Sequence, residues 1–167
     1  MSRRETVYLA GGCFWGTEKF FDQFDGVCET EVGYANGPTP NPSYRDVCAD
    51  AGHAETVKIV FDPDKLPFPV LLQHYFLVID PLSVNRQGHD EGIQYRTGIY
   101  YTNELQKAAA LGYAAALEVQ LGQKIAVEIL PLENFYPAEE YHQKYLDKNP
   151  GGYCHIPASL LELEKKA

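Results

Sequence analysis

Cys13 is the residue whose surroundings in this 167-residue chain most favour chemistry. It follows Gly11 and Gly12, where a short apolar run gives way to a helical pattern. The unpaired N–H groups and the dipole at the start of a helix stabilise a negative charge, and the thiolate is the nucleophilic form of cysteine. We therefore interpret Cys13 as a candidate nucleophile. The simpler alternative is a buried core cysteine beside ordinary core aromatic residues, Phe14 and Trp15.

Two carboxyl groups lie at or shortly before the starts of expected strands. Glu55 opens one of these strands, and Asp90 comes shortly before another. A carboxyl group that is shielded by aromatic side chains keeps its proton to a higher pH, because burial disfavours the charged form, and it can then donate that proton. The hydroxyl groups of Tyr44 and Tyr95 are candidates to face the same site. The alternatives are solvated acids at strand ends and tyrosines that simply pack at the surface.

A second cysteine, Cys154, follows two glycines near the end of the chain. A mobile second thiol is what a sulfenic acid on a first cysteine needs for conversion to a disulfide. This role requires the tail to reach the start of the Cys13 helix, because a disulfide needs Cα atoms within ~7 Å. The alternative is an idle tail cysteine. Cys28 falls in a strand pattern and is expected in the core, whereas the pattern leaves Cys48 unassigned.

The histidines suggest two further kinds of site. His53, His142 and His155 are possible metal ligands, but a metal site needs about four ligands at recognisable spacings, and the sequence has no Cys-x-x-Cys or Cys-x-x-His pair. We therefore expect no metal. His53 or His155 as a base for Cys13 would make a cysteine hydrolase, which is one alternative function. A redox-sensing or peptide-binding module without turnover is another.

The composition limits the partners of the chain. Asp and Glu outnumber Lys and Arg by 23 to 14, and a net charge of −9 disfavours binding to nucleic acid or to an anionic membrane. The most apolar stretch, 67–82, is interrupted by polar residues and is too short to span a membrane. Nothing before residue 13 resembles an export signal, so we expect a cytoplasmic protein with reduced cysteines. We also expect a monomer.

Alternating strands and helices must position these residues. Periodicity predicts strands at 6–10, 27–34, 55–61, 96–101 and 125–130 and helices at 13–24, 69–79, 103–121 and 138–148. The third helix, capped by Thr102 or Asn103, is expected to bury Leu105, Ala109, Gly112, Ala116 and Val119. Glycine and proline mark long, functional loops at 34–52 and 80–92 and an irregular tail from about residue 149.

The order of these elements predicts one α+β catalytic domain over residues 1–167. Strand–helix–strand, a long loop and strand–helix–strand form the order of a split βαβ, or ferredoxin-like, plait with a mainly antiparallel sheet and packed helices. A chain of this length has room for one core and needs no disulfide framework to hold it.

Six motifs in this order resemble peptide methionine sulfoxide reductase of type A over residues 6–157. They are Gly12-Cys13-Phe14-Trp15-Gly16, Tyr44-Arg45-Asp46-Val47-Cys48, Gly52-His53-Ala54-Glu55, Asp90-Glu91-Gly92-Ile93-Gln94-Tyr95-Arg96, Tyr141-His142-Gln143 and Gly152-Tyr153-Cys154. The chain has Ala49-Asp50-Ala51 before Gly52, where the family usually has a threonine, and His89 where it usually has asparagine. No cysteine follows Cys154, so a relay to a third cysteine, found in some members, is not expected.

The resemblance implies a reduction of methionine S-sulfoxide to methionine, in peptides and proteins and also free. Cys13 would attack the sulfur, and protonated Glu55 would deliver a proton to the oxygen. The hydroxyl groups of Tyr44 and Tyr95 would hold that oxygen, and Asp90 would orient or polarise the site.

The resemblance also implies how the pocket and the recycling work. Phe14 and Trp15 would form the walls of the pocket that accepts the methyl group of the substrate. Cys154 would condense with the sulfenic acid on Cys13, and thioredoxin would reduce the resulting disulfide, without a metal or an organic cofactor. The implied role is the repair of oxidised proteins.

Overall fold

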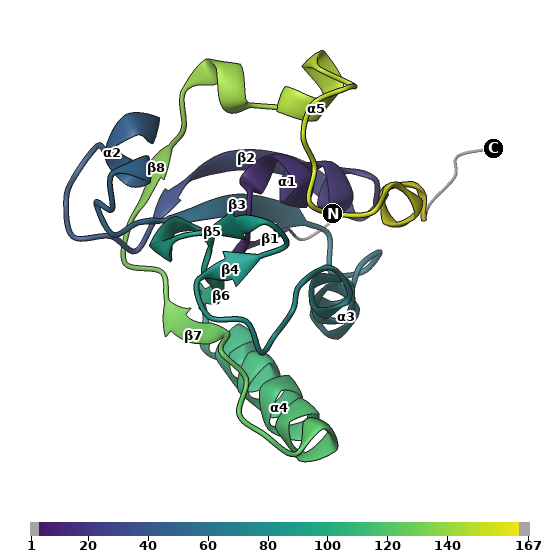
Figure 1. The fold of residues 1–167 in the computed structure, drawn as a ribbon. Helices are drawn as coiled ribbons and strands as arrows, with labels where there is room; N and C mark the ends of the chain where they lie inside the picture. Colours follow the sequence, from purple (N-terminus) through teal and green to yellow (C-terminus); the bar gives the residue numbers. More distant parts are fainter. Residues whose placement is uncertain (1–3, 164–167) are drawn as a thin grey trace.

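A six-stranded sheet lies at the centre of residues 4–163, which the computed structural model describes (Figure 1). The strand order is β7-β6-β1-β3-β2-β8, and neighbouring strands are antiparallel except for the parallel pair β6 and β7. The strands are β1 (Glu5–Gly11), β2 (Val27–Ala35), β3 (Ala54–Phe61), β6 (Thr97–Tyr101), β7 (Glu128–Pro131) and β8 (Phe135–Pro137). This mixed α+β structure with a mainly antiparallel sheet and packed helices agrees with the sequence prediction.

Five α-helices and several shorter elements surround the sheet in the described residues. The α-helices are α1 (Phe14–Asp22), α2 (Tyr44–Cys48), α3 (Phe68–Val78), α4 (Glu104–Leu121) and α5 (Tyr145–Lys148). The 3₁₀ helices are η1 (Ile93–Tyr95), η2 (Glu140–His142) and η3 (Ala158–Glu162), and a small hairpin consists of β4 (Arg86–Gln87) and β5 (Asp90–Glu91). In Figure 1, α4 projects from the sheet, while the chain from β8 to α5 passes over α1 and β2.

The main core joins β1 and β3 to α1 and α3. Val57, Ile59 and Phe61 of β3 are fully buried, as their alternate spacing predicts. They share one hydrophobic cluster with side chains from the other three elements, which include Val7, Leu9, Phe20, Phe21, Leu71 and Leu72. Burial of apolar area is the main stabilising term in folding, so this cluster fixes α1 and β3 relative to each other. Cys13 lies at the start of α1 and Glu55 at the start of β3.

The predicted inner face of α4 is wrong except at Ala109, which is partly buried against the core. The helix has its predicted cap at Asn103 and ends at Gly122, but Leu105 and Val119 are 82% and 85% exposed. The buried positions are Gln106, Ala110 and Ala114. Gln106 faces inward because its amide group bonds the backbone of both Thr6 and Thr102. Besides these buried positions, Tyr113 stacks on Phe76 of α3 with ring centroids 4.6 Å apart.

The predicted helix at 138–148 is broken into η2 and α5. Gln143 bonds the backbone N–H and C=O of Val32 in β2 through its side-chain amide. The next residue, Lys144, has a φ of +53°, and its N–H donates to Glu18. These long-range bonds replace the local helical ones, so the segment follows the sheet instead of continuing as a helix.

Several loop predictions also need correction. The loop at 34–52 contains α2, which Ser43 and Asp46 start with a capping box, and the loop at 80–92 contains the β4–β5 hairpin. Cys28 is exposed and not in the core, because a bulge between Val27 and Glu29 takes it out of the strand register. The last predicted strand starts at Glu128, and periodicity missed β8.

None of the helices in the described residues is long and apolar enough to cross a membrane.

Candidate active site

Cys13 lies at the turn between β1 and α1. It is the cap residue of α1, and its side chain is 7% exposed. Gly12 has a φ of +84°, and a Cβ atom there would lie 2.7 Å from the Cβ atom of Gln87, so both conformation and space require glycine. The Thr17 hydroxyl group donates to the Gly11 carbonyl oxygen at 3.2 Å and strengthens the turn from the helix side.

Glu55 lies at the start of β3 and reaches the same turn. Its side chain is 1% exposed, and its Oε1 atom accepts a hydrogen bond from the Phe14 N–H at 3.1 Å. Burial raises the pKa of Glu55 to about 8; the Phe14 N–H opposes this shift, and the charge of Asp90 adds to it. Glu55 is therefore a protonated carboxylic acid at neutral pH, next to the residue that bears the thiol.

Opposing influences act on the pKa of Cys13. Burial raises the pKa of this thiol well above its ordinary value, and the negative charge of Glu55 is the next cause in the same direction. The N–H of Trp15, at the start of α1, opposes the shift but does not outweigh burial. Burial thus favours the thiol form of Cys13, while the helix start acts in the opposite direction.

Tyr44 and Tyr95 come to this site from two short helices. Tyr44 is the first residue of α2, and its N–H donates to Glu139 at 3.0 Å, while Tyr95 is the last residue of η1. Burial and the charge of Glu55 raise the pKa of both phenols above the ordinary value. Both hydroxyl groups therefore keep their protons and can serve as hydrogen-bond donors.

Asp90 lies on the hairpin at the edge of the same site. Its Oδ2 atom accepts a hydrogen bond from the Tyr153 hydroxyl group at 3.0 Å. Its negative charge raises the pKa of Cys13, Glu55 and Tyr95, although in each case it is a smaller cause than burial. Asp90 therefore adds negative charge to the site and holds the residue next to Cys154.

The tail carries Cys154 to the first turn of α1. Cys154 is half-buried, and its Sγ atom lies 2.9 Å from where a Cβ atom on Gly16 would be. The next residue, His155, bonds the Gly11 carbonyl oxygen through its Nε2 atom at 2.9 Å. The charge of Cys154 also contributes to the pKa shift of Cys13. All four cysteines are free in the structure.

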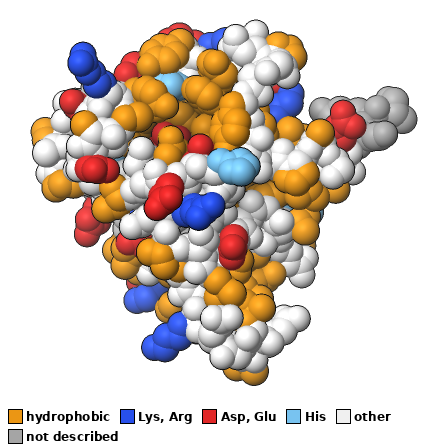
Figure 2. All heavy atoms as spheres, in the orientation of Figure 1, with side chains coloured by type: hydrophobic (Ala, Val, Ile, Leu, Met, Phe, Trp, Pro, Cys, Tyr) orange, Lys and Arg blue, Asp and Glu red, His pale blue; other side chains and the backbone are white. Residues whose placement is uncertain are grey.

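Aromatic side chains surround the start of α1. Figure 2 shows hydrophobic side chains gathered on the face between α2 and α5, with acidic ones among them. Phe14 is buried against Tyr34 and His142, whereas Trp15 is partly exposed and stacks on Tyr145 with ring centroids 3.8 Å apart. Sequence reasoning missed the contributions of four residues: Glu139, His142, Tyr145 and Tyr153. The motifs around His142 and Tyr153 were signals for two of these contributions, and nothing in the pattern pointed to Glu139 or Tyr145.

The histidines offered as bases are bonded elsewhere. His53 is buried, and its Nε2 atom lies 2.7 Å from the Thr39 carbonyl oxygen. The Nε2 atom of His155 also bonds a backbone carbonyl group. Acidic, thiol and backbone groups, not histidines, shift the pKa of Cys13. Within the described part of the chain, no group of three or more His, Cys, Asp and Glu side chains is arranged to hold a metal ion.

Comparison with known proteins adds to this geometry. The family model of peptide methionine sulfoxide reductase matches residues 5–166. The chain belongs to this reductase family. Peptide methionine sulfoxide reductase MsrA of Clostridium acetobutylicum is 54% identical over 157 residues, which cover 93% of this chain and 97% of that protein. The chain is thus similar to the type A members of the family.

Two solved structures resemble the fold closely. Reduced Mxr1 from Saccharomyces cerevisiae has a TM-score of 0.86 and 37% identity, and the match covers 93% of this chain and 92% of Mxr1. Methionine sulfoxide reductase A of Corynebacterium diphtheriae has a TM-score of 0.82 and 40% identity, with 92% and 83% of the two chains covered. Each match covers more than nine-tenths of the reductase.

Proposed function

We propose that this reductase acts on the S epimer of methionine sulfoxide, in peptides and free, with Cys13 as nucleophile and Glu55 as proton donor. The observation that carries the proposal is the hydrogen bond from the Phe14 N–H to Oε1 of Glu55 at 3.1 Å. It places a carboxyl group with a pKa of about 8 at the start of the helix that bears the thiol.

The first step transfers the sulfoxide oxygen to the enzyme. The sulfur of Cys13 attacks the sulfoxide sulfur while the Glu55 carboxyl group protonates the oxygen, which makes it a better leaving group. The thiol proton of Cys13 then replaces the proton that Glu55 has given. The oxygen then passes as a hydroxyl group from the substrate sulfur to the Cys13 sulfur while the bond between the two sulfurs breaks. Methionine leaves, and Cys13 becomes a sulfenic acid. One thiol and one sulfoxide thus give one sulfenic acid and one methionine, with no other reactant consumed.

The neighbouring groups position the sulfoxide. The hydroxyl groups of Tyr44 and Tyr95 keep their protons and donate to the sulfoxide oxygen as its negative charge develops. Asp90 polarises this edge of the site. The rings of Phe14 and Trp15 provide an apolar surface for the methyl group of the substrate.

The second half of the cycle returns the enzyme to its dithiol form. Cys154 condenses with the sulfenic acid on Cys13, water leaves, and a disulfide forms. Cys154 lines an open groove of about 220 Å³, together with Leu146 and Leu161 among others, so a reductant can reach its sulfur. Mxr1 has been solved in a complex with Trx2, and thioredoxin is the reductant we propose here, with no metal or organic cofactor.

We extend the proposal to the architecture. We propose a split βαβ plait at the centre of one catalytic domain. Its support is the strand order β6-β1-β3-β2, in which α1 joins β1 to β2 and α3 lies between β3 and β6 in the chain. We expect this domain to act as a monomer in the cytoplasm, where thioredoxin stays reduced.

Chromatography of two epimeric peptides tests the proposed reaction. Each peptide, with S- or R-methionine sulfoxide, is incubated with dithiothreitol and either wild-type protein or Cys13→Ser. We expect reduction of the S epimer alone and loss of this reduction in the variant. Reduction of both epimers would contradict the assigned stereochemistry, and turnover by folded Cys13→Ser would contradict the assigned nucleophile.

A further inference from the structure

His142 is a buried histidine that the mechanism above does not use. It is the last residue of η2, and its exposed fraction is 0%. The Trp15 Nε1–H donates a hydrogen bond to its Nδ1 atom at 2.9 Å. Its ring also contacts Phe14 and Tyr44, with centroid distances of 5.2 and 4.5 Å. Three of its neighbours are thus residues of the proposed site.

The hydrogen bond to Trp15 defines the protonation state of His142. An indole N–H can only donate, so Nδ1 must be the unprotonated nitrogen, and the proton of the neutral ring lies on Nε2. The Nε2 atom is buried and has no hydrogen-bond partner in the described residues. A protonated ring would carry hydrogen on both nitrogens, and its Nδ1–H would then face the indole N–H.

The surroundings of His142 favour this neutral form. Burial lowers the pKa of His142, and the negative charge of Glu139, at the start of the same 3₁₀ helix, opposes the shift. The other titratable neighbours are Tyr44 from α2 and Tyr141 from η2, and the pKa of each is raised, so both stay neutral. The hydrogen bond to Trp15 is therefore intact at neutral pH.

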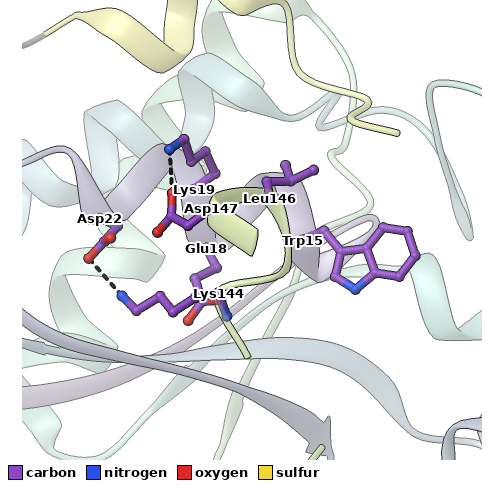
Figure 3. Close-up of a pocket in the computed structure, with 7 residues that line it drawn as sticks. All are labelled: Trp15, Glu18, Lys19, Asp22, Lys144, Leu146 and Asp147. Carbon is purple, nitrogen blue, oxygen red and sulfur yellow. Dashed lines mark hydrogen bonds and ion pairs between the residues drawn. The ribbon is translucent and has the colours of Figure 1, made fainter. Parts of the chain in front are cut away.

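Other contacts hold the segment near Trp15 but not the edge of the indole. Tyr145 stacks on the indole face at 3.8 Å with an angle of 12° between the rings. Two ion pairs fasten this segment to α1, Lys19 with Asp147 and Lys144 with Asp22. Figure 3 shows both pairs on one side of α1 and the Trp15 indole apart from them. Stacking sets the plane of the indole but not which edge faces His142, because a flip about the Cβ–Cγ bond keeps the ring in the same plane. The hydrogen bond to His142 therefore sets the orientation of the indole.

We propose that His142 is a positioning residue for sulfoxide binding, which acts through Trp15 by holding the indole as a wall of the methyl site. The inference rests on the proposed function, in which Trp15 forms that wall. It predicts that loss of the Nδ1 acceptor weakens binding of the sulfoxide and leaves the reaction of Cys13 with bound substrate nearly unchanged. Protonation of His142 has the same effect as loss of the acceptor.

Two substitutions of His142 distinguish the role of its hydrogen-bond acceptor from the role of its aromatic ring. His142→Asn puts the Oδ1 atom close to the Nδ1 position and keeps a neutral acceptor, whereas His142→Phe keeps an aromatic ring without one. The measurement is the single-turnover rate of methionine formation at pH 7 against the concentration of an S-sulfoxide peptide. We expect His142→Phe to raise the half-saturating concentration about five- to tenfold, which corresponds to the loss of one hydrogen bond. The maximal rate should change less than about threefold, and His142→Asn should resemble the wild type.

A double-mutant cycle tests whether the effect passes through Trp15. Trp15→Phe removes the donor, so adding His142→Phe to it should cost nothing further in half-saturating concentration. Additive costs, or a loss confined to the maximal rate, would overturn the proposal. Equal defects in His142→Asn and His142→Phe would overturn it as well, because they would show a need for the ring and not for the acceptor.

Fluorescence provides a readout that needs no substrate. Trp15 is the single tryptophan of the chain, and a protonated imidazole beside an indole quenches its emission. Acidification of the wild type should quench Trp15 with a midpoint below the ordinary histidine pKa, and His142→Asn should not show this transition. A transition that persists in His142→Asn would contradict the assignment. If the proposed reductase chemistry failed, turnover would vanish while this titration remained.

Discussion

The backbone N–H of Phe14 donates a hydrogen bond to the Oε1 atom of Glu55, 3.1 Å away. The two residues are 41 positions apart, and each belongs to an element of the main core, α1 for Phe14 and β3 for Glu55. The bond therefore fixes the carboxyl group against the start of the helix that carries Cys13. Since both partners are buried, their geometry depends on the packing of the core and not on a mobile loop.

Glu55→Gln should lower the pKa of Cys13. The negative charge of Glu55 raises the pKa of this thiol, and an amide removes that charge while its oxygen can still accept the Phe14 N–H. The rate of Cys13 alkylation by iodoacetamide, followed by mass spectrometry against pH, should shift to lower pH. The exposed Glu29→Gln is the control, and equal profiles for the two variants would contradict the coupling.

The raised pKa of Glu55 also predicts a stability change with pH. The folded protein holds a proton up to about pH 8, whereas the unfolded chain releases it near the ordinary value of 4.5. The free energy of unfolding should therefore fall as pH rises between these values, by at most about 1.4 kcal/mol per pH unit from this group. Urea unfolding of Glu55→Gln should lack this decline, while Glu29→Gln should keep it. Parallel curves for both variants would show that Glu55 is ionised in the folded state.

Cys154→Ser should stop the cycle after the first step. Without the second thiol, reduced enzyme should form one methionine per chain and keep a sulfenic acid on Cys13, which dimedone traps. Wild type should give a Cys13–Cys154 disulfide in peptide mapping, and the exposed Cys28→Ser should behave like the wild type. A disulfide between other cysteines after one turnover would remove Cys154 from the resolving role without affecting Cys13.

Two glycines within helices give a matched test of the tail position. A Cβ atom on Gly16 would lie 2.9 Å from the Sγ atom of Cys154, whereas one on Gly112 meets no atom within 4 Å. Gly16→Ala should slow disulfide formation by roughly tenfold or more, because a small displacement of reacting groups is costly, and should leave methionine formation within about threefold. Gly112→Ala should change neither rate and should stabilise the protein by roughly 0.5–1 kcal/mol. Rapid quenching followed by mass spectrometry measures the rates of methionine formation and disulfide formation. Equal rates of disulfide formation in the two variants would contradict this placement of Cys154.

Local pattern was enough to predict most of the sheet. The strands around Leu9, Val32, Ile59 and Ile99 were predictable because their apolar residues alternate or run together at the centre of the core. The caps of α4 were also readable, since Asn103 and Gly122 act through local chemistry. Elements whose conformation depends on nearby residues can thus be predicted from sequence.

Features that depend on distant partners could not be predicted in this way. Gln106 faces inward because Thr6, 100 positions away, offers a carbonyl group. The helix expected at 138–148 breaks where Gln143 bonds Val32. The same holds for the site. The position of Cys13 at a helix start could be predicted from the sequence, whereas the burial that raises the pKa of its thiol depends on the whole fold.

The single-turnover rate of Glu55→Gln tests the central claim most directly. Reduced wild type, Glu55→Gln and Glu29→Gln are mixed with a saturating S-sulfoxide peptide without reductant, and methionine is measured over time. If Glu55 donates the proton, Glu55→Gln should form methionine about 10²- to 10⁴-fold more slowly than the wild type, and Glu29→Gln should match the wild type. A folded Glu55→Gln that forms methionine at the wild-type rate would contradict the assignment of Glu55 as proton donor to the sulfoxide.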